Sequence, residues 1–270
     1  MRFNKKTALI TGGGTGIGAA VARRIRQEGG NVALVGRRPE PLRAVADEIG
    51  ATVIAADAAD GVAMRAALET VVETFGGLDI LIANAGGHGV GPTVSMSDET
   101  WDLAVRLNLN TAFVSARESL PHLIRSRGNI VVLASIAGLF AGPDAAGYVT
   151  MKHGCIGLAK SLARDYGRKG VRTNSVCPGW VTTAMADEQM QVIVDKFKLK
   201  SVEEAYALVT KGCAARPPGK CRGCRQCRLL SGLGGGLDDQ RRDPDRRRRG
   251  RHGRSADPRL CTMMKRRKFR

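Results

Sequence analysis

Several ordinary features are scarce in this sequence of 270 residues. No apolar run approaches the roughly 20 residues that a membrane span requires. The N-terminal segment MRFNKKTALITGGG has no apolar stretch of signal-peptide length and leads directly into a strand and a glycine loop. Only Cys155 and Cys177 precede residue 213, and two lone cysteines in a large domain predict reduced, buried thiols. We therefore expect a cytoplasmic protein with no targeting segment and no membrane partner.

Acidic and aromatic residues are scarce in the last 60 residues. Residues 211–270 contain 20 Lys and Arg against 5 Asp and Glu, and Phe269 is their one aromatic residue. Residues 1–210 contain 23 against 20, which is the balance of an ordinary soluble domain. Because the net charge of +18 comes mainly from the end of the chain, it says little about what the main domain binds.

Short apolar runs alternate with helical patterns in the first part of the chain. The runs are too short for helices and lack strict polar alternation, which is typical of strands buried on both faces. Six strands are expected, at 7–11, 31–36, 52–57, 78–86, 129–135 and 171–179. Segments between them, such as GIGAAVARRIRQEGG, have apolar residues at helical spacing. This alternation predicts an α/β fold, a single domain with a Rossmann-type doubly wound parallel sheet.

A glycine-rich segment, TGGGTGIG at 11–18, follows the first predicted strand and opens the first predicted helix. Glycines there permit a tight turn and let main-chain N–H groups approach a pyrophosphate, while the helix N-terminus adds partial positive charge. A plain glycine turn is the alternative. The position between strand and helix favours a dinucleotide site.

Two arginines, Arg37 and Arg38, follow the second predicted strand. Sites that prefer NAD usually have an acidic residue at this point, which binds the ribose 2′-OH. Two guanidiniums suit a 2′-phosphate instead, because they can bind it bidentately. The alternative is that both arginines are merely solvated at the start of a helix. The sequence favours NADP(H) over NAD(H).

Tyr148 and Lys152 are four residues apart and share one face of a predicted helix. A nearby ammonium and a bound nicotinamide cation favour the phenolate, so we expect the tyrosine pKa to fall below its usual value of about 10. Such a pair can donate a proton to a carbonyl oxygen that receives hydride. Ser135 ends the preceding strand, at the carboxyl edge where ligands bind in this fold, and can hydrogen-bond the same oxygen.

Taken together, these segments resemble the short-chain dehydrogenase/reductase family over roughly residues 5 to 190. TGGGTGIG matches the family's TGxxxGxG motif, NAG at 84–86 and PGWVTT at 178–183 match two more, and Asp57 matches the acidic residue at the adenine. The resemblance implies hydride transfer between NADP(H) and a carbonyl/alcohol pair. It also implies a small-molecule substrate and a homo-oligomer, and it calls for no metal.

The resemblance further implies the site residues. Tyr148 would be the acid/base, Lys152 would tune it and hold the ribose, and Ser135 would orient the substrate. Asn108 in VRLNLN would keep a water in the proton relay. The cofactor-binding residues that the resemblance implies are Gly12, Gly14, Thr15, Gly16, Ile17, Gly18, Arg37, Arg38, Asp57, Ala58, Asn84, Ala85, Gly86, Tyr148, Lys152, Pro178, Gly179, Val181 and Thr183.

Few residues in the sequence indicate which substrate the protein binds. Met, Val and Phe residues in the segment after Thr183 favour an apolar substrate. His88, in the loop after Asn84, could contact the substrate or be solvated.

The resemblance ends near Gly212, where the family has a further helix and an edge strand. We expect residues 1–211 to form the NADP-binding domain without those two elements, and 212–270 to be an irregular, basic, disordered tail rich in Arg, Gly and Cys. A one-nucleotide frameshift explains this change. With suitable codons, KCRGCRQC read one base later gives SAEDVAS, GGGLDD gives EAASM and DPDRRRR gives ILTVDGG. These blocks resemble the family's missing helix, loop and last strand, in order.

A functional tail is the alternative to a frameshift. Cys221, Cys224 and Cys227, with Cys213 or Cys261, could bind zinc, although CxxCxxC lacks the paired spacing of ordinary zinc modules. The arginines could bind phosphates non-specifically, but no aromatic residues interleave with them, so no specific nucleic-acid partner is expected. The second hypothesis for the whole chain is therefore a non-catalytic or inactive cofactor-binding protein whose tail binds nucleic acid or metal.

Restoring the reading frame near residue 212 is expected to increase both stability and turnover. Loss of the last helix and strand would expose on the order of a few hundred Å² of apolar surface, which costs several kcal/mol at about 25 cal/mol/Å². That cost is comparable with a whole domain stability of about 5–15 kcal/mol. Thermal unfolding and NADPH oxidation measured on both versions test this, and equal values would contradict the frameshift interpretation.

Overall fold

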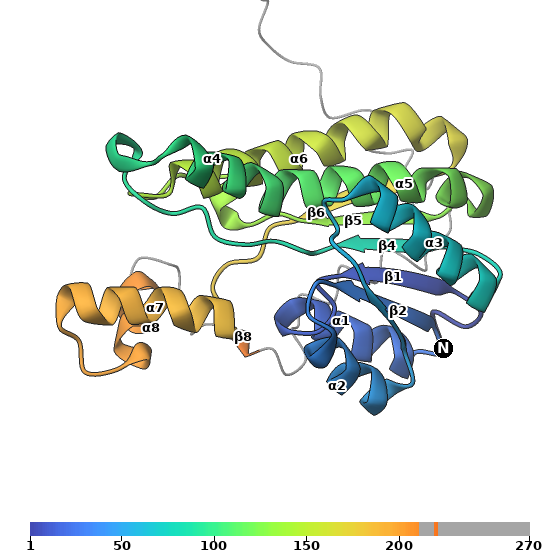
Figure 1. Ribbon diagram of the computed structural model, residues 1–270, viewed down its shortest axis with the longest axis horizontal. Coiled ribbons are helices and arrows are strands. Elements are labelled where there is room, and N and C mark those ends of the chain that lie inside the picture. The colour runs from blue at the N-terminus through green and yellow to red at the C-terminus, as the bar shows by residue number, and fades with distance from the viewer. Residues whose placement is uncertain (211–218, 221–270) are drawn as a thin grey trace, which may run out of the picture. The chain divides into compact units, whose positions relative to one another are not determined.

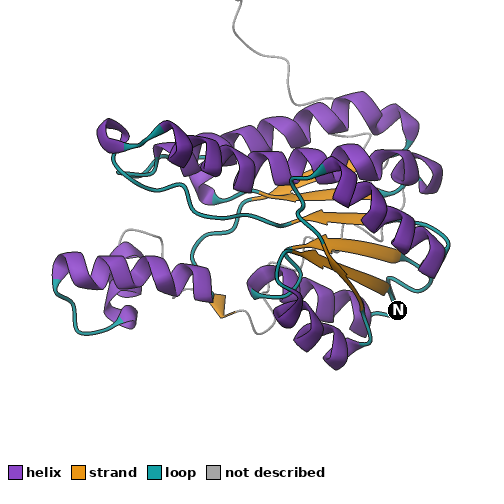
Figure 2. Ribbon diagram, in the orientation of Figure 1, coloured by secondary structure: helices purple, strands orange, loops and turns teal. Residues whose placement is uncertain are grey.

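The computed structural model describes residues 1–210 and 219–220, which form a three-layer α/β structure. Helices lie on both sides of a central sheet (Figures 1 and 2). The strands are β1 (Thr7–Thr11), β2 (Asn31–Gly36), β3 (Thr52–Ala55), β4 (Ile80–Ala83), β5 (Asn129–Leu133), β6 (Arg172–Val176), β7 (Val181–Thr182) and β8 (Gly219–Lys220). The α-helices are α1 (Gly16–Gln27), α2 (Pro39–Ile49), α3 (Gly61–Phe75), α4 (Asp98–Ala104), α5 (Thr111–Ser126), α6 (Ala146–Tyr166), α7 (Ala184–Phe197) and α8 (Val202–Thr210). The shorter helical segments are η1 (Thr93–Ser95), η2 (Val105–Asn110), η3 (Ile136–Gly138) and η4 (Gly167–Lys169).

The main sheet is parallel, with the strand order β3-β2-β1-β4-β5-β6. This order confirms the predicted Rossmann-type doubly wound sheet, and each of the six predicted strands is present. The strand order reverses between β1 and β4, which places the ligand-binding crevice of this fold outside their carboxyl ends. β7 and β8 form a separate parallel pair of two residues each.

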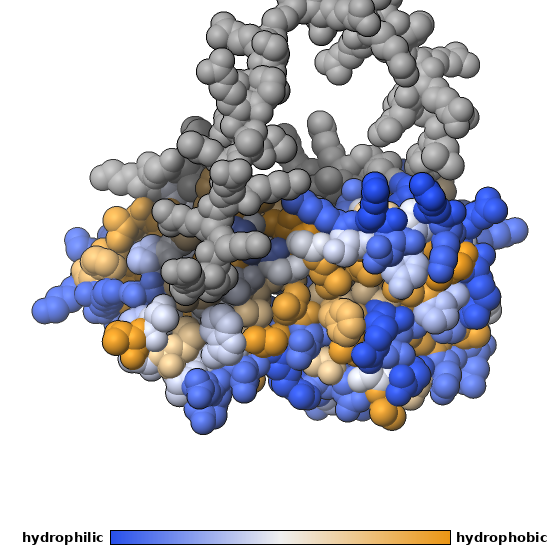
Figure 3. All heavy atoms as spheres, turned by 90° about the horizontal axis from the view of Figure 1, so that it is seen from above, coloured by the Kyte–Doolittle hydropathy of each residue, from blue (hydrophilic) through white to orange (hydrophobic). Residues whose placement is uncertain are grey.

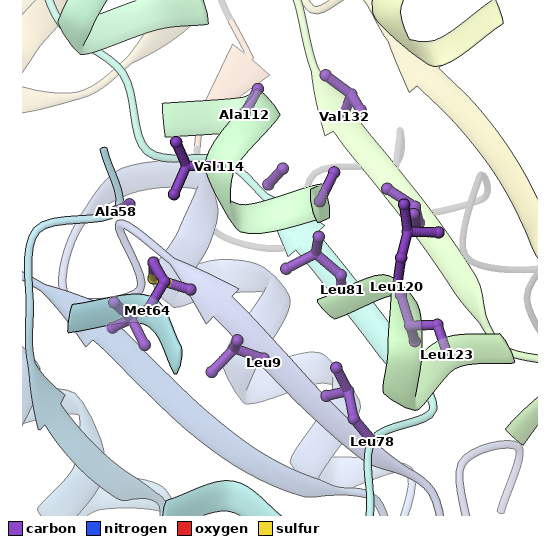
Figure 4. Close-up of a cluster of buried hydrophobic side chains, with 14 of the residues drawn as sticks. Leu9, Ala58, Met64, Leu78, Leu81, Ala112, Val114, Leu120, Leu123 and Val132 are labelled. Carbon is purple, nitrogen blue, oxygen red and sulfur yellow. The ribbon is translucent and has the colours of Figure 1, made fainter. Parts of the chain in front are cut away.

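Apolar runs form these strands because both faces of the sheet are covered. Successive side chains of a strand point to opposite faces, so Leu9 and Leu81 join one core while Ile10 and Ile82 join the other. The first core packs against α3, α5 and α6, and Figure 4 shows Leu9 and Leu81 among its side chains. The second core packs against α1 and α2.

A third, smaller core lies between α7 and α8. It contains Ala186 and Met190 from α7 and Ala205 and Tyr206 from α8, all buried. The ring of Trp180 packs edge-on against Tyr206, with 6.3 Å between ring centroids. These two helices therefore form a hairpin that buries one set of apolar side chains between its two helices, while Met185, Val192, Phe197 and Leu208 are exposed.

The outer part of the sheet has little helical cover on the α1/α2 side. Among the described residues, the helices packed on β5 and β6 are α5 and α6, which cover the opposite face. On the α1/α2 side, Leu133 and Val176 are only partly buried, and Asn174 of β6 is exposed. The predicted tail, 212–270, with its candidate zinc cysteines, lies outside the described residues apart from Gly219 and Lys220 in β8.

The surface of the described part mixes apolar and charged side chains. Figure 3 shows the two kinds interspersed over one face. None of the helices at 1–210 combines the length and apolar character needed to cross a membrane.

One buried hydroxyl joins the two central strands at their carboxyl ends. Thr11 Oγ1 accepts hydrogen bonds from the backbone N–H groups of Asn84 (3.1 Å) and Ala85 (3.0 Å), and it donates to the Ile82 carbonyl (3.4 Å). Thr11 is fully buried, so water cannot replace these contacts. This hydroxyl fixes the segment after β4 relative to the glycine loop after β1.

Thr11→Val is expected to lower the free energy of unfolding by about 1–3 kcal/mol, because two buried N–H groups lose their acceptor while the side-chain shape is kept. Urea unfolding measures the change. Thr70→Val is the matched control, since the Thr70 hydroxyl bonds the Ala66 carbonyl on the exposed side of α3. The control is expected to stay within about 0.5 kcal/mol. A Thr11→Val effect no larger than that of the control would contradict the assigned role.

Candidate active site

The glycine loop after β1 has the geometry of an anion-binding turn. Gly12 (φ +65°) and Gly16 (φ +53°) lie in the left-handed region that favours glycine. A Cβ added to Gly18 would collide with the Gly12 carbonyl, and one added to Gly14 would lie 2.9 Å from the backbone of Leu42. The predicted glycines are therefore required by the close approach of α1 and α2 to the loop.

The N-terminus of α1 is open to a ligand. Its N-cap, Thr15, makes no side-chain capping bond, and the first turn contains no acidic residue. Ile17 packs against the second core and anchors this turn. The first N–H groups of a helix have no partner within the helix and carry partial positive charge, so they can bind a phosphate.

The segment Asn84–Ala85–Gly86 lies beside the glycine loop, as expected for adjacent strands. The Asn84 side chain donates hydrogen bonds to the carbonyls of Thr11 (3.0 Å) and Gly12 (3.1 Å). A Cβ added to Gly86 would lie 3.6 Å from the Lys152 ammonium nitrogen. This segment therefore connects the loop after β1 with the residues predicted to be catalytic.

Arg37 and Arg38 follow β2, and both are exposed. Within the described part of the chain, neither guanidinium has a hydrogen bond or an ion pair. Both are therefore available to an anion at the end of β2. Their availability is compatible both with a 2′-phosphate site and with simple solvation.

Asp57 lies two residues beyond β3, next to the buried Ala58. Its carboxylate accepts hydrogen bonds from the Ala59 N–H (2.9 Å) and from the Arg106 guanidinium (2.8 Å). Burial acts to raise the pKa of Asp57, but these hydrogen bonds and the charges of Arg106 and Arg37 outweigh it and lower the pKa. The contact with Arg106 joins residues 49 positions apart and could not be predicted from any local pattern.

Ser135, Tyr148 and Lys152 lie together, as predicted. Ser135 follows β5, its hydroxyl accepts from the Ala137 N–H (3.2 Å), and it is near enough to the Tyr148 phenol to act on the pKa of that group. Lys152 is 5% exposed, and its ammonium donates to the Leu133 carbonyl (3.0 Å) and lies 5.5 Å from the centre of the Tyr148 ring. The loop before α6 and the first turns of α6 thus place a phenol, a hydroxyl and a buried ammonium at the end of β5.

The predicted fall of the Tyr148 pKa, which included a bound nicotinamide cation, stays a prediction, because the structure describes the protein without a ligand. Burial raises the pKa of Tyr148, and this effect outweighs the influence of Ser135, which acts to lower it. Burial also lowers the pKa of Lys152, although the nearby thiols of Cys155 and Cys177 act in the opposite direction. A fall in the Tyr148 pKa therefore requires that the nearby charges, including that of a bound nicotinamide cation, outweigh the cost of removing a phenolate from water.

Asn108 lies in η2, a single π-helical turn between α4 and α5. Such turns are frequent at functional sites. The side chain is 1% exposed and donates to the carbonyls of Ala104 and His88 (both 3.1 Å), and its oxygen accepts from the Gly87 N–H (3.2 Å). The bonds with Gly87 and His88 hold the loop after β4 against the helix, and the bond to Ala104 fixes the amide on the helix itself.

Cys155 is buried one turn after Lys152 on α6, and its thiol donates to the Asn108 carbonyl (3.4 Å). Burial raises the pKa of this thiol. Burial of Cys155 confirms the prediction for this residue, whereas Cys177, predicted to be buried too, is only partly buried. The contact of Cys155 with Asn108 had no sequence signal. Among residues 1–210, no group of three or more His, Cys, Asp or Glu side chains is arranged to hold a metal ion.

The segment from Pro178 to Thr183 links the two halves of the site. The Pro178 carbonyl accepts from the Ile136 N–H (2.9 Å), beside Ser135. Gly179 has open space around its Cα, and Val181 is buried in β7. Thr183 caps α7 by accepting from the Ala186 N–H (3.2 Å), and its methyl group would lie 3.1 Å from a Cβ added to Gly16.

These features fit a dinucleotide. The open helix N-terminus and the glycine turn suit its phosphates, and the group at the end of β5 can move a proton. The arrangement can therefore combine cofactor binding with acid/base chemistry at one edge of the sheet.

Comparisons with known proteins agree with this geometry. The short chain dehydrogenase family matches residues 6–192. Protein MoaE of Klebsiella aerogenes is 44% identical over 219 residues, which cover 79% of this chain and 82% of that protein. Cyclohexanol dehydrogenase of Acinetobacter sp. (strain SE19) is 40% identical over 194 residues, covering 69% and 77%.

Solved structures show the same similarity. A crystal structure of a variant of actinorhodin polyketide ketoreductase with NADPH superposes with a TM-score of 0.80 at 32% identity, covering 86% of this chain and 92% of that chain. The chain belongs to the short chain dehydrogenase family and is an oxidoreductase of alcohol and carbonyl groups.

Proposed function

We propose that this chain interconverts a carbonyl and an alcohol with NADP(H), using Ser135, Tyr148, Lys152 and Asn108. The observation that carries the proposal is the cluster at the end of β5, where the Tyr148 ring lies 5.5 Å from the ammonium of the buried Lys152 and Ser135 acts on the pKa of the phenol. No other described part of the chain joins a titratable pair of this kind to a glycine turn. The phenol is the proton donor in the direction of reduction.

The residues act on the carbonyl oxygen of the substrate. When bound, NADPH supplies the hydride that the carbonyl carbon receives. Tyr148 donates its phenolic proton to the carbonyl oxygen, and Ser135 donates a hydrogen bond to the same oxygen as negative charge develops there. An alcohol leaves, and Tyr148 remains as a phenolate.

Lys152 and Asn108 support the phenol. The Lys152 ammonium keeps one donor on the Leu133 carbonyl and has two more for ribose hydroxyls. Its charge stabilises the phenolate that forms. We assign to Asn108 the holding of a water that returns a proton to Tyr148, and the π-helical turn around this residue supports that role.

The preference for NADP(H) rests on the two exposed arginines after β2. Arg37 and Arg38 have no competing hydrogen-bond or ion-pair partner among the described residues, so both can bind a 2′-phosphate. The similarity to a ketoreductase structure with NADPH supports this cofactor. The phosphates would lie on the glycine loop and the α1 N-terminus, the adenine near Asp57 and Ala58, and the nicotinamide beside the 178–183 segment.

The substrate and the assembly follow from the same proposal. The similarity to cyclohexanol dehydrogenase supports a small alcohol or ketone as substrate. We also propose a homo-oligomer, because Trp101 and Leu103 on α4 and Phe113 on α5 are exposed apolar side chains. The division between a reductase domain at 1–211 and a separate tail at 212–270 remains part of this proposal.

Tyr148→Phe is expected to lower kcat for ketone reduction by about 10²- to 10⁴-fold, the usual contribution of a general acid. The dissociation constant for NADPH should not change, because the hydroxyl is not needed to bind the phosphates. Tyr166→Phe, at the other end of α6, is the matched control and should keep wild-type turnover. NADPH absorbance measures both, and wild-type turnover in Tyr148→Phe would contradict the proposal.

The pH dependence provides a second readout for the same variant. Alcohol oxidation requires the phenolate, and burial raises the pKa of Tyr148. Because that pKa lies above the usual value of about 10, the rate of oxidation should rise with pH into the alkaline range as the phenolate fraction grows. The rate of reduction should fall only in that alkaline range, where the acid form is lost. If the residual activity of Tyr148→Phe depends on pH in the same way as the wild-type activity, a group other than Tyr148 causes the pH dependence.

Arg37→Ala and Arg38→Ala are each expected to weaken NADPH binding by about 10- to 100-fold, the effect of losing a hydrogen bond between charged groups. NADH binding should change little, because NADH has no 2′-phosphate. Arg43→Ala on the exposed side of α2 is the matched control and should leave both affinities unchanged. Fluorescence titration measures the constants, and an equal loss for both cofactors would show that the arginines do not bind the 2′-phosphate.

A further inference from the structure

The main chain at His88 is held between two of the proposed catalytic residues. The Asn108 side chain donates to the His88 carbonyl (3.1 Å) and accepts from the Gly87 N–H (3.2 Å). The next residue, Gly89, accepts a hydrogen bond from the Tyr148 N–H (2.8 Å). His88 therefore has a fixed position beside the phenol.

The imidazole of His88 contacts helix α7 through both ring nitrogens. Nε2 lies 3.3 Å from a carboxylate oxygen of Glu188, and Nδ1 lies 3.0 Å from the amide nitrogen of Gln189. A carboxylate only accepts and an amide nitrogen only donates, so the neutral ring with its proton on Nε2 satisfies both contacts. This geometry distinguishes His88 from a solvated loop histidine.

The contacts of His88 with Glu188 and Gln189 show which face of α7 is directed toward the loops beside Tyr148. Residues 185, 188, 189, 192 and 196 share one face of a helix, because they are separated by three, four, seven and eleven positions. At the far end of this face, the Lys196 ammonium lies 3.9 Å from the carboxylate of Asp144, in the loop before α6. The face with positions 188, 189 and 196 is thus directed toward the loops that follow β4 and β5.

Two apolar side chains lie on the same face of α7. Met185 is 42% exposed and Val192 is 65% exposed. The apolar face of α7 formed by Ala186 and Met190 packs against α8 instead. Met185 and Val192 are therefore free of the α8 packing and available to an apolar ligand, and the His88 contacts lie between them along the helix.

We propose that His88 is a positioning residue that fastens α7 beside Tyr148, so that Met185 and Val192 contact the apolar part of a carbonyl substrate. The inference rests on the proposed function, because it takes the Tyr148 cluster as the reacting site. His88 acts through Glu188 and Gln189 and does not touch the reacting atoms. The substrate class is a neutral ketone with an apolar body.

Kinetics of His88 variants test this inference, with cyclohexanone as the probe ketone. His88→Ala should raise KM by about tenfold, the effect of losing two ordinary hydrogen bonds, with a smaller change in kcat and an unchanged NADPH dissociation constant. His88→Gln should restore most of the wild-type KM, since an amide can also donate to Glu188 and accept from Gln189. His122→Ala on α5, whose ring contacts Arg125, is the matched control.

A double-mutant comparison identifies the partner. Glu188→Ala should raise KM, and the double variant His88→Ala/Glu188→Ala should resemble His88→Ala alone, because the two residues act through one contact. Fully additive effects would overturn the proposed link between His88 and α7.

Hydrogen exchange of the amides in α7 supplies a readout that needs no turnover. His88→Ala should speed exchange in α7 while the amides of α5 exchange as in the wild type. If the wild-type chain reduces no ketone, the proposed function fails, while the exchange rates still decide the role of His88. Unchanged exchange in α7 overturns the inference, whatever the value of KM. If KM is raised while exchange is unchanged, His88 acts on the substrate directly and not through α7.

Discussion

The site depends on the parallel sheet, which brings the carboxyl ends of β1, β4 and β5 to one edge. The Thr11 hydroxyl and the Asn84 amide lock the first two of these ends together, so the glycine turn and the loop after β4 behave as one unit. Asn108 attaches that unit to η2, and Lys152 attaches α6 to the end of β5 through the Leu133 carbonyl. Every group that the proposed chemistry needs is therefore held by backbone contacts at the ends of strands, where a rigid scaffold can fix its position.

The same burial that fixes Tyr148 and Lys152, which we propose to be catalytic, also opposes their charged forms. Burial raises the pKa of Tyr148 and lowers that of Lys152, so both groups are driven toward neutrality before a ligand binds. A protonated phenol is the form that reduction requires, and a bound cofactor with a positively charged ring would favour the phenolate that oxidation requires. Burial in the protein thus favours the protonated phenol, and the charge of the bound cofactor would favour its deprotonation.

The sequence was sufficient for the sheet and for most residues at its carboxyl edge, because these depend on local patterns. The apolar runs that form β1 to β6, the glycines of the first turn and the Tyr148–Lys152 spacing are all visible in short windows. The contacts that join distant segments had no such signal. The Arg106 guanidinium donates to the Asp57 carboxylate, 49 positions earlier in the chain, and the Cys155 thiol donates to the Asn108 carbonyl, 47 positions earlier. The His88 ring contacts Glu188 of α7, 100 positions later. The effect of burial on the Tyr148 pKa had no such signal either, since burial is a property of the packed structure.

The central claim is that one buried phenol supplies the proton when a carbonyl receives hydride. Single-turnover reduction by the wild-type protein, with NADPH deuterated at the transferred position and in heavy water, tests it most directly. The account predicts that each isotopic change slows the step and that the two effects combine, because proton and hydride move in the same chemical step. A turnover slowed by the deuterated cofactor but indifferent to heavy water would contradict it.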